Sequence, residues 1–208
     1  MLLQIAYSHD VLTSKISRVV VCVAALVAAA CNATPDGNPK VPAGAKSSGG
    51  KTAVIETNAG PIEIEFLEAD APRAVENFRL LAEHQYYDGL MLHRVVRGFM
   101  IQGGDPLGNG MGGESAWGGS FPDEINRDSQ LYRDGYRRGI VAMANSGRNT
   151  NGSQFFIMHE TYPLQPDYVI FARVTAGMDV VDRIAGMPTE MGGERPLTPP
   201  VIKTITVR

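Results

Sequence analysis

The chain has 208 residues, of which 44% are hydrophobic, and a formal net charge of −3 at pH 7. This balance argues against a nucleic-acid-binding protein, because such proteins normally present a basic patch. The densest basic cluster, Arg133, Arg137 and Arg138, is interrupted by Asp134 and is better interpreted as a solvated face.

The first thirty residues have the pattern of a secretory signal peptide. Lys15 and Arg18 precede an apolar run, residues 19–30, built only of Val, Ala, Leu and Cys22. Twelve residues are too few to span a bilayer core as a helix, which needs about 20 apolar residues. Export with cleavage is therefore favoured over a permanent membrane span.

Cys31 follows three alanines, a pattern similar to an Ala-x-Ala cleavage site and to the lipobox of bacterial lipoproteins, in which the cysteine after the cut carries lipid. The lipobox match departs from the usual pattern at Ala28, where Leu is common. Cys31 is thus either a candidate lipid anchor or one more small residue of a hydrophobic run. Cleavage would also remove Cys22, so no intramolecular disulfide is expected. The expected location is the periplasm or cell envelope.

Residues 31–51 are rich in Pro, Gly, Ser, Ala, Asn and Lys and are expected to form a flexible linker. Residues 52–208 then form one domain, which opens with two β-favouring runs, 52–56 and 62–66, joined by a turn sequence typical of a hairpin. Residues 71–84 place Val75, Phe78, Leu81 and Ala82 on one face at helical spacing, with Asp70 as the expected N-cap.

The rest of the domain contains short apolar runs that predict strands. A second, short helix is expected over residues 178–184, and residues 103–139 are expected to form a long loop rich in Gly, Asp, Asn and Ser. Eight strands with two helices favour a closed eight-stranded antiparallel β-barrel, capped by the two α-helices, over a parallel sheet. The later predicted strands are residues 94–96, 99–102, 140–144, 154–158, 169–174 and 202–207.

Common catalytic and ligand-binding motifs are missing from the sequence. His159-Glu160 has no second histidine at the spacing of a zinc-binding helix, and the glycine-rich stretch 103–119 has no Gly-Lys-Ser/Thr ending that would cradle phosphates. A serine hydrolase elbow is also missing. We therefore expect neither metal nor cofactor, and we expect the four histidines to be structural or exposed.

Two long segments, residues 92–105 and 141–157, closely resemble the cyclophilin family of peptidyl-prolyl cis-trans isomerases. Residues 71–78 and 168–171 extend the resemblance over essentially all of residues 52–208. The resemblance implies a bacterial, exported and monomeric isomerase, a candidate lipoprotein, that acts on X–Pro bonds of unfolded or flexible polypeptides. A non-catalytic peptide-binding chaperone module of the same fold is the alternative.

The resemblance assigns catalysis to Arg94. Rotation about a peptide bond has a barrier of about 18–20 kcal/mol, and X–Pro isomers exchange over tens of seconds or more. In the twisted amide the prolyl nitrogen regains its lone pair, so a donor placed there stabilises the transition state more than the planar ground state. A guanidinium stays charged and presents several donors in a rigid plane. Gln102 is expected to hold it in place.

The remaining site residues are also implied by the resemblance. The walls of the proline pocket are assigned to Phe99, Met100, Phe156 and Leu164, whereas the adjacent Phe155 should point into the core. Asn145 is expected to bind substrate through its main chain and Gln102 through its amide. The other expected peptide-binding residues are Ala144, Gln154 and Tyr168.

Two positions depart from the common family pattern. Tyr168 stands where many cyclophilins carry a histidine, and it still offers a hydroxyl and an aromatic face. Pro163 stands where many members carry a tryptophan that is important for binding cyclosporin, so tight cyclosporin binding is not expected. Trp117, the single tryptophan, is expected to pack a loop or border a substrate pocket.

Overall fold

The computed structural model describes residues 41–208. All described residues belong to one compact unit. The predicted signal peptide and the candidate lipid anchor Cys31 lie outside the described residues. Among residues 41–208, no helix has the length and apolar character needed to cross a membrane.

The domain begins with the predicted hairpin. β1 (Thr52–Thr57) pairs antiparallel with β2 (Gly60–Phe66), and Ile55 lies opposite Ile62. Residues of β2 alternate between the core and the solvent, as expected for a strand with one buried face. In the turn, Thr57 Oγ1 donates to the carbonyl of Gly60 at 2.7 Å.

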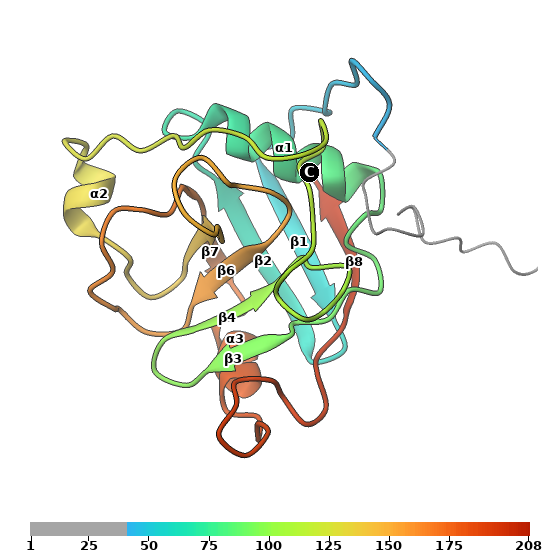
Figure 1. Ribbon diagram of the computed structural model, residues 1–208, viewed down its shortest axis with the longest axis vertical. Coiled ribbons are helices and arrows are strands. Elements are labelled where there is room, and N and C mark those ends of the chain that lie inside the picture. The colour runs from blue at the N-terminus through green and yellow to red at the C-terminus, as the bar shows by residue number, and fades with distance from the viewer. Residues whose placement is uncertain (1–40) are drawn as a thin grey trace, which may run out of the picture. The chain divides into compact units, whose positions relative to one another are not determined.

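Eight antiparallel strands form one sheet in the order β3-β4-β6-β5-β7-β2-β1-β8, which confirms the predicted strand number and class (Figure 1). The remaining strands are β3 (Arg94–Val96), β4 (Met100–Gly103), β5 (Ile140–Met143), β6 (Phe155–Met158), β7 (Ile170–Ala176) and β8 (Ile202–Val207).

The predicted closure of the barrel is wrong, because no ladder joins the two edge strands β3 and β8 within the described chain. An isolated bridge between Met91 and Val201 and a bond from Leu92 N to the Pro200 carbonyl connect the flanking segments instead. Pro199 and Pro200 precede β8, and proline has no N–H to donate to a ladder. The sheet is therefore a curled, open half-barrel.

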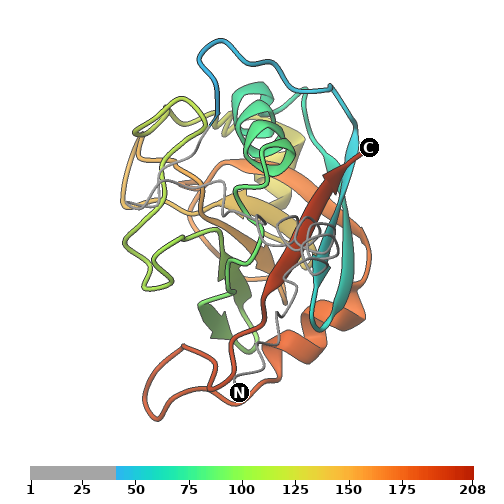
Figure 2. The ribbon, with the colours of Figure 1, turned by 90° about the vertical axis from the view of Figure 1, so that its right-hand side faces the viewer.

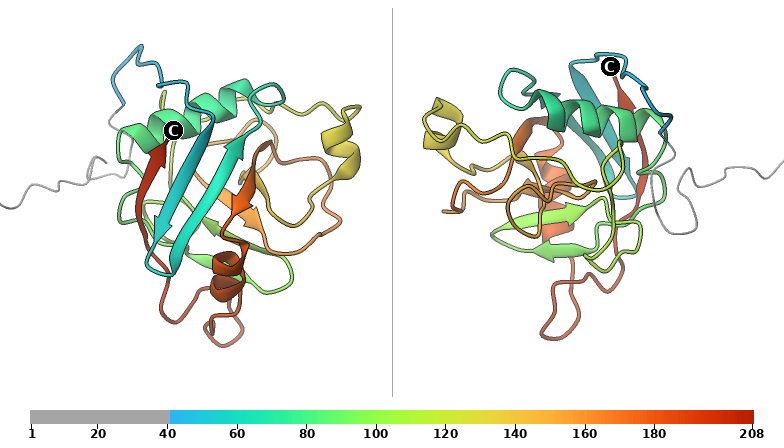
Figure 3. Two further views of the ribbon diagram at one scale, coloured as in Figure 1. Left: turned by 180° about the vertical axis from the view of Figure 1, so that it is seen from behind. Right: turned by 45° about the horizontal axis from the view of Figure 1, so that its top comes forward.

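Two predicted helices lie at opposite ends of the strands, α1 (Pro72–Glu83) at one end and α3 (Met178–Ala185) at the other (Figure 3). The N-cap of α1 is Ala71 rather than the predicted Asp70. Glu124 takes over the capping role, because its carboxylate accepts the amides of Arg73 at 2.9 Å and Ala74 at 2.8 Å. A carboxylate from a distant loop thus satisfies the exposed donors of this helix.

A third helix, α2 (Gln130–Asp134), falls within the region predicted as loop. Five residues are too few to show helical periodicity in the sequence. The Ser129 hydroxyl caps it by accepting the Tyr132 amide at 3.3 Å, and Gly135 ends it. Tyr132 in turn anchors the chain near the cleft described below.

The core is built around Phe78 of α1, which is fully buried. Its ring lies between 5.1 and 5.9 Å from the rings of Phe66, Tyr87, Phe155 and Phe171. Phe155 belongs to this cluster, as predicted, whereas its neighbour Phe156 belongs to a second cluster on the other face of the sheet.

Residues 41–50 run along α1 before the first strand (Figure 2). The Ser47 amide donates to the Glu76 carboxylate at 3.0 Å, and the Ser48 hydroxyl donates to Glu83 at 2.6 Å. Val41 and Ala45 pack against the core. This part of the predicted linker is thus in contact with the domain.

Candidate active site

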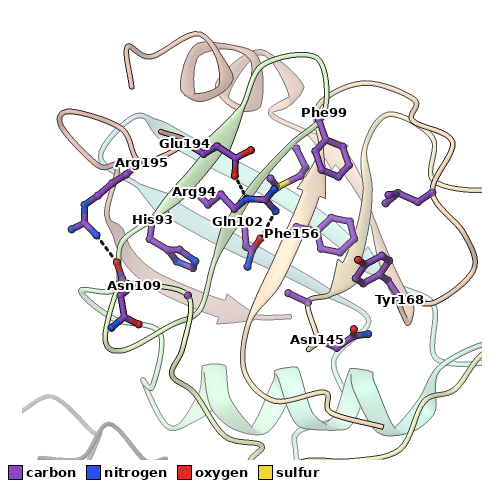
Figure 4. A pocket seen from close by; sticks show the side chains of 15 residues that line it. His93, Arg94, Phe99, Gln102, Asn109, Asn145, Phe156, Tyr168, Glu194 and Arg195 are labelled. Carbon is purple, nitrogen blue, oxygen red and sulfur yellow. Dashed lines mark hydrogen bonds and ion pairs between the residues drawn. The ribbon is translucent and has the colours of Figure 1, made fainter. Parts of the chain in front are cut away.

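A row of side chains crosses three strands on the outer face of the sheet. Arg94 lies directly opposite Gln102 in the β3–β4 pair, and Gln102 lies opposite Phe156 in the β4–β6 pair. Directly opposed residues project to the same face, so these three side chains converge. Met100 shares that face because it lies two residues before Gln102. They line a cleft of about 550 Å³ (Figure 4).

The Arg94 guanidinium has two side-chain partners. Its Nε donates to Glu194 Oε2 at 2.5 Å and its Nη1 donates to Gln102 Oε1 at 3.2 Å, as the dashed lines in Figure 4 mark. Its carbon Cζ lies 5.9 Å from the centre of the Phe99 ring. The Arg94 side chain is 37% exposed, so a molecule in the cleft can reach the group.

Gln102 extends this network away from Arg94. Its Nε2 donates to Gln154 Oε1 at 2.9 Å, and Gln154 Nε2 donates to the carbonyls of Gly110 at 3.0 Å and Gly112 at 2.9 Å. Because an amide side chain has one donor and one acceptor end, this chain of bonds fixes the orientation of Gln102. The acceptor oxygen of Gln102 therefore faces Arg94.

The glycine-rich loop that receives Gln154 is organised by the buried carboxylate of Asp105. Its oxygens accept the amides of Leu107 and Asn109 at 2.9 Å and of Gly110 at 2.6 Å. Gly112 must lack a side chain, because a Cβ there would lie 2.4 Å from Asp105 Oδ1. The loop thereby contributes Gly108, Asn109 and Gly110 to the wall of the cleft.

The other side of the cleft is apolar. Met100 and Phe156 are buried, and Phe99, Leu164 and Tyr168 pack against them. The Phe156 and Tyr168 rings meet edge to face with centres 5.4 Å apart. An apolar ring entering the cleft would therefore lose water without leaving polar groups unpaired.

Two buried tyrosines hold Tyr168 at the cleft. The Tyr136 hydroxyl donates to the Tyr168 carbonyl at 2.8 Å, and the Tyr132 hydroxyl approaches the same oxygen at 3.3 Å. Burial raises the pKa of Tyr132 to about 12 and raises the pKa of Tyr136 as well. Both hydroxyls therefore remain protonated donors at neutral pH.

Asn145 presents its main chain to the cleft. Its side-chain amide is occupied, because Nδ2 donates to the Asp167 carbonyl at 2.9 Å and Oδ1 accepts the Gly147 amide at 3.2 Å. Its main-chain N–H and C=O have no partner among residues 41–208. The preceding Ala144 differs, since its amide is bonded to the Gln154 carbonyl at 3.0 Å.

His93 lines the cleft although it is only 6% exposed. Neither ring nitrogen has a hydrogen-bond partner in the described part of the chain. Burial lowers the pKa of His93 below its ordinary value of 6.5, and the nearby charges of Arg195 and Arg94 act in the same direction, whereas Asp105 opposes them. His93 is therefore held as a neutral, buried side chain.

The structure brings nine of the ten predicted side chains to this cleft, and the tenth, Gln154, lines an adjoining cavity of about 240 Å³. Trp117 lies elsewhere, where its ring packs edge-on against Phe121 with centres 5.9 Å apart. Pro163 is exposed beside Leu164. The nine are Arg94, Phe99, Met100, Gln102, Ala144, Asn145, Phe156, Leu164 and Tyr168.

Several cleft residues were not predicted from the sequence, chiefly Asn109, Glu194 and Arg195. Glu194 lies 100 residues from Arg94 in a polar, glycine-containing segment that carries no periodic signal. Only the folded chain places it there. Among residues 41–208, no group of three or more His, Cys, Asp or Glu side chains is arranged to hold a metal ion.

Comparison with known proteins finds extensive similarity. Residues 52–207 match the profile of the family described as "Cyclophilin type peptidyl-prolyl cis-trans isomerase/CLD". The chain is 50% identical over 159 residues to peptidyl-prolyl cis-trans isomerase 9 of Schizosaccharomyces pombe, covering 76% of this chain and 25% of that protein. It is 45% identical over 161 residues to peptidyl-prolyl cis-trans isomerase CYP18-1 of Arabidopsis thaliana, covering 75% and 95%.

The chain thus spans about a quarter of the length of the first relative and nearly all of the second. Solved structures agree with the sequence comparison. The crystal structure of a cyclophilin-type peptidyl-prolyl cis-trans isomerase of Cryptosporidium parvum superposes with a TM-score of 0.71 at 37% identity, covering 76% of this chain and 98% of that one. A second structure, described as in the presence of the dipeptide Ala-Pro, gives a TM-score of 0.70.

Proposed function

The chain belongs to the family of cyclophilin-type peptidyl-prolyl cis-trans isomerases, and from this premise we propose how its cleft accelerates rotation about X–Pro bonds. The single observation that supports the proposal best is the position of Arg94. Its guanidinium is held beside an apolar floor that suits a proline ring, with donor groups still exposed to the cleft.

Arg94 acts on the prolyl nitrogen. As the amide twists, resonance is lost and the nitrogen becomes pyramidal with a localised lone pair. A guanidinium N–H donates to that lone pair only in the twisted state, so the bond lowers the barrier more than it stabilises either planar isomer. The guanidinium is held before the substrate binds by hydrogen bonds to Gln102 and Glu194, so little reorganisation is needed during rotation.

The proline ring is bound by Phe99, Met100, Phe156 and Leu164. Met100 and Phe156 are buried and form the floor, and Tyr168 closes one side through its contact with Phe156. Holding the ring fixed lets the preceding residue rotate about the bond. The structure of the Cryptosporidium parvum relative in the presence of Ala-Pro supports a proline-containing ligand for this fold.

The substrate backbone is held by groups on either side of this pocket. The free main-chain N–H and C=O of Asn145 can pair with an extended peptide, as one strand pairs with another. Ala144 borders the same region, and Gln102 and Gln154 line the adjoining cavity. These contacts recognise the backbone and therefore tolerate many side chains.

An isomerisation assay on a proline-containing tetrapeptide tests the proposal. We expect Arg94→Ala to lower kcat/KM by at least tenfold. Arg97→Ala is a matched control, because Arg97 is exposed near the same strand and lines a different cavity. An unchanged rate for Arg94→Ala would remove Arg94 from the mechanism.

A peptide-binding module without turnover is the alternative function of such a cleft. Affinity needs only the apolar pocket and the main-chain groups of Asn145, whereas an arginine held beside the pocket serves rotation. The two are separated by measuring both properties on one preparation. Suppression of client aggregation without any isomerase rate would favour the binding module.

We further propose that the clients are exported proteins and that Cys31 anchors the enzyme to a membrane of a bacterial cell envelope. The support is confined to the sequence: an apolar run after Lys15 and Arg18, three alanines before the cysteine, and a polar linker. Mass analysis of the mature N-terminus, with Cys31→Ser as the comparison, tests this. An unprocessed N-terminus would contradict export, and a processed but unlipidated one would contradict the anchor.

A further inference from the structure

We propose that Glu194 is a positioning residue, which orients the Arg94 guanidinium for catalysis. The inference rests on the proposed function, because it concerns how Arg94 is held rather than whether it acts. Glu194 lies in the segment between α3 and β8, and Figure 4 shows its carboxylate directed at Arg94 from the side opposite Phe156.

The contact is held by the main chain as well as by the side chain. The amide of Val95, the residue after Arg94, donates to the Glu194 carbonyl at 2.7 Å. This bond fixes the Glu194 backbone beside β3, so the carboxylate needs only to turn toward the neighbouring guanidinium. A flexible surface pair would lack this support and would contribute little.

The next residue, Arg195, secures the same segment through its side chain. Its Nη1 donates to the Gly108 carbonyl at 2.5 Å, which ties the segment to the glycine-rich loop. Its Nη2 lies 3.3 Å from the Met91 sulfur. Glu194 therefore lies in a segment that is bonded both to the chain before β3 and to the glycine-rich loop.

Two hydrogen bonds from different nitrogens of Arg94 fix the plane of its guanidinium. Nε donates to Glu194 at 2.5 Å, and Nη1 donates to Gln102 at 3.2 Å. The remaining nitrogen, Nη2, has no partner among residues 41–208, which leaves its donors for a ligand in the cleft. With Gln102 alone, the planar group could still turn about that single bond, and its free donors would lose a fixed direction.

Two other roles for Glu194 make different predictions. If its negative charge weakened Arg94 as a donor, removing the charge would speed the reaction. If Glu194 served only to hold its own segment in place, its loss would act independently of Arg94. A positioning role requires that the effect pass through Arg94 and that it fall on the rate rather than on peptide binding.

The experiment measures kcat/KM together with the on-enzyme interconversion rate and the peptide Kd by NMR exchange, on the full mature domain. The variants are Glu194→Ala, which removes the acceptor, and Glu194→Gln, which keeps an acceptor oxygen without the charge. Glu190→Gln is the control for loss of a negative charge in the same segment. Glu190 does not touch Arg94, and its exposed ion pair with Arg195, with 3.9 Å between Oε1 and Nε, is of the kind that contributes little. Each variant is also made in the Arg94→Ala background.

We expect Glu194→Ala to lower the interconversion rate about fivefold, equivalent to about 1 kcal/mol, with Kd changed less than twofold. Glu194→Gln and Glu190→Gln should stay within about twofold of the wild type. In the Arg94→Ala background, Glu194→Ala should have no further effect. An unchanged or faster rate for Glu194→Ala, an equal loss in Glu194→Gln, or a full effect without Arg94 would overturn the proposal.

These outcomes are distinct from failure of the proposed function. If the wild type showed no isomerase rate, or if Arg94→Ala were as fast as the wild type, the function assigned to the cleft would fail first. The Glu194 variants are interpreted only if the wild type is active and the Arg94→Ala variant is slower than the wild type. Thermal unfolding of each variant shows whether the segment remains folded.

Discussion

Replacing Gln102 with leucine tests the hydrogen-bond chain behind Arg94. Leucine is close in size to glutamine and keeps the apolar part of the side chain, but it removes both the acceptor for Arg94 Nη1 and the donor to Gln154. Gln102 lies on a strand paired on both sides, so the backbone should not move. The expected loss in the interconversion rate therefore comes from the freed guanidinium, whereas loss of the Gln102 amide as a contact for the peptide backbone bears on Kd.

The magnitude follows from the kind of bond that is lost. A hydrogen bond to a charged group contributes about 1.5–3 kcal/mol. The 3.2 Å length and the 37% exposure of the Arg94 side chain place this one at the lower end. A loss of about 1.5 kcal/mol predicts a fall in kcat/KM of roughly tenfold.

Gln154→Leu is a second variant for the same assay, and a smaller loss of kcat/KM is expected for it than for Gln102→Leu. It breaks the chain one step farther away and leaves the Gln102 oxygen facing Arg94, so we expect a fall of only about two- to threefold. The measurement is a protease-free isomerisation assay, with thermal unfolding to check that both variants fold. A Gln102→Leu enzyme within twofold of the wild type, or a Gln154→Leu enzyme slower than Gln102→Leu, would refute the reasoning.

Two further predictions concern stability. Arg79 and Lys51 hold the pKa of Glu68 at about 2 instead of its ordinary 4.5, so its contribution is present above pH 4.5 and is lost as the pH falls toward 2. Denaturant titrations should show a steeper loss for the wild type than for Glu68→Gln over that range, and parallel curves would contradict the assignment. Phe78→Ala should lower the free energy of unfolding by about 3–5 kcal/mol, because it opens a cavity among four aromatic rings; a loss below about 1 kcal/mol would mean that the core is not built as described.

Local patterns were sufficient to predict most of the elements. The strand Gly60–Phe66 and the helix Pro72–Glu83 carry their burial periodicity in the sequence, and the structure places both where that periodicity predicts them. The opposite faces of Phe155 and Phe156 likewise follow from strand geometry alone. Such features depend on residues that are close together in the chain.

Features that depend on distant residues were missed or wrong. Asp70 has the composition of an N-cap, but Glu124 supplies the carboxylate from a loop about fifty residues away. Barrel closure was predicted from the number of strands, yet no ladder joins β3 and β8 within the described chain, and only an isolated bridge between Met91 and Val201 links the segments beside them. The contact of Glu194 with Arg94 was missed for the same reason, because no local sequence pattern indicates which part of the folded domain a polar loop contacts.

The site was predictable to the extent that a family resemblance fixes it. The motif around Arg94 predicted a cleft, and the register of β3, β4 and β6 brings Arg94, Gln102 and Phe156 together. Composition or periodicity alone would have left Arg94 as an exposed strand-end arginine. The way in which its guanidinium is held could be described only from the folded chain.

The central claim is that Arg94 stabilises the twisted amide rather than the bound peptide. NMR exchange on an enzyme-bound proline peptide tests it most directly, because it separates the interconversion rate from Kd. The account predicts that Arg94→Ala lowers the interconversion rate at least tenfold while Kd changes less than threefold, and that Arg94→Lys recovers only part of the rate. A variant that loses peptide affinity but keeps the wild-type interconversion rate would contradict it.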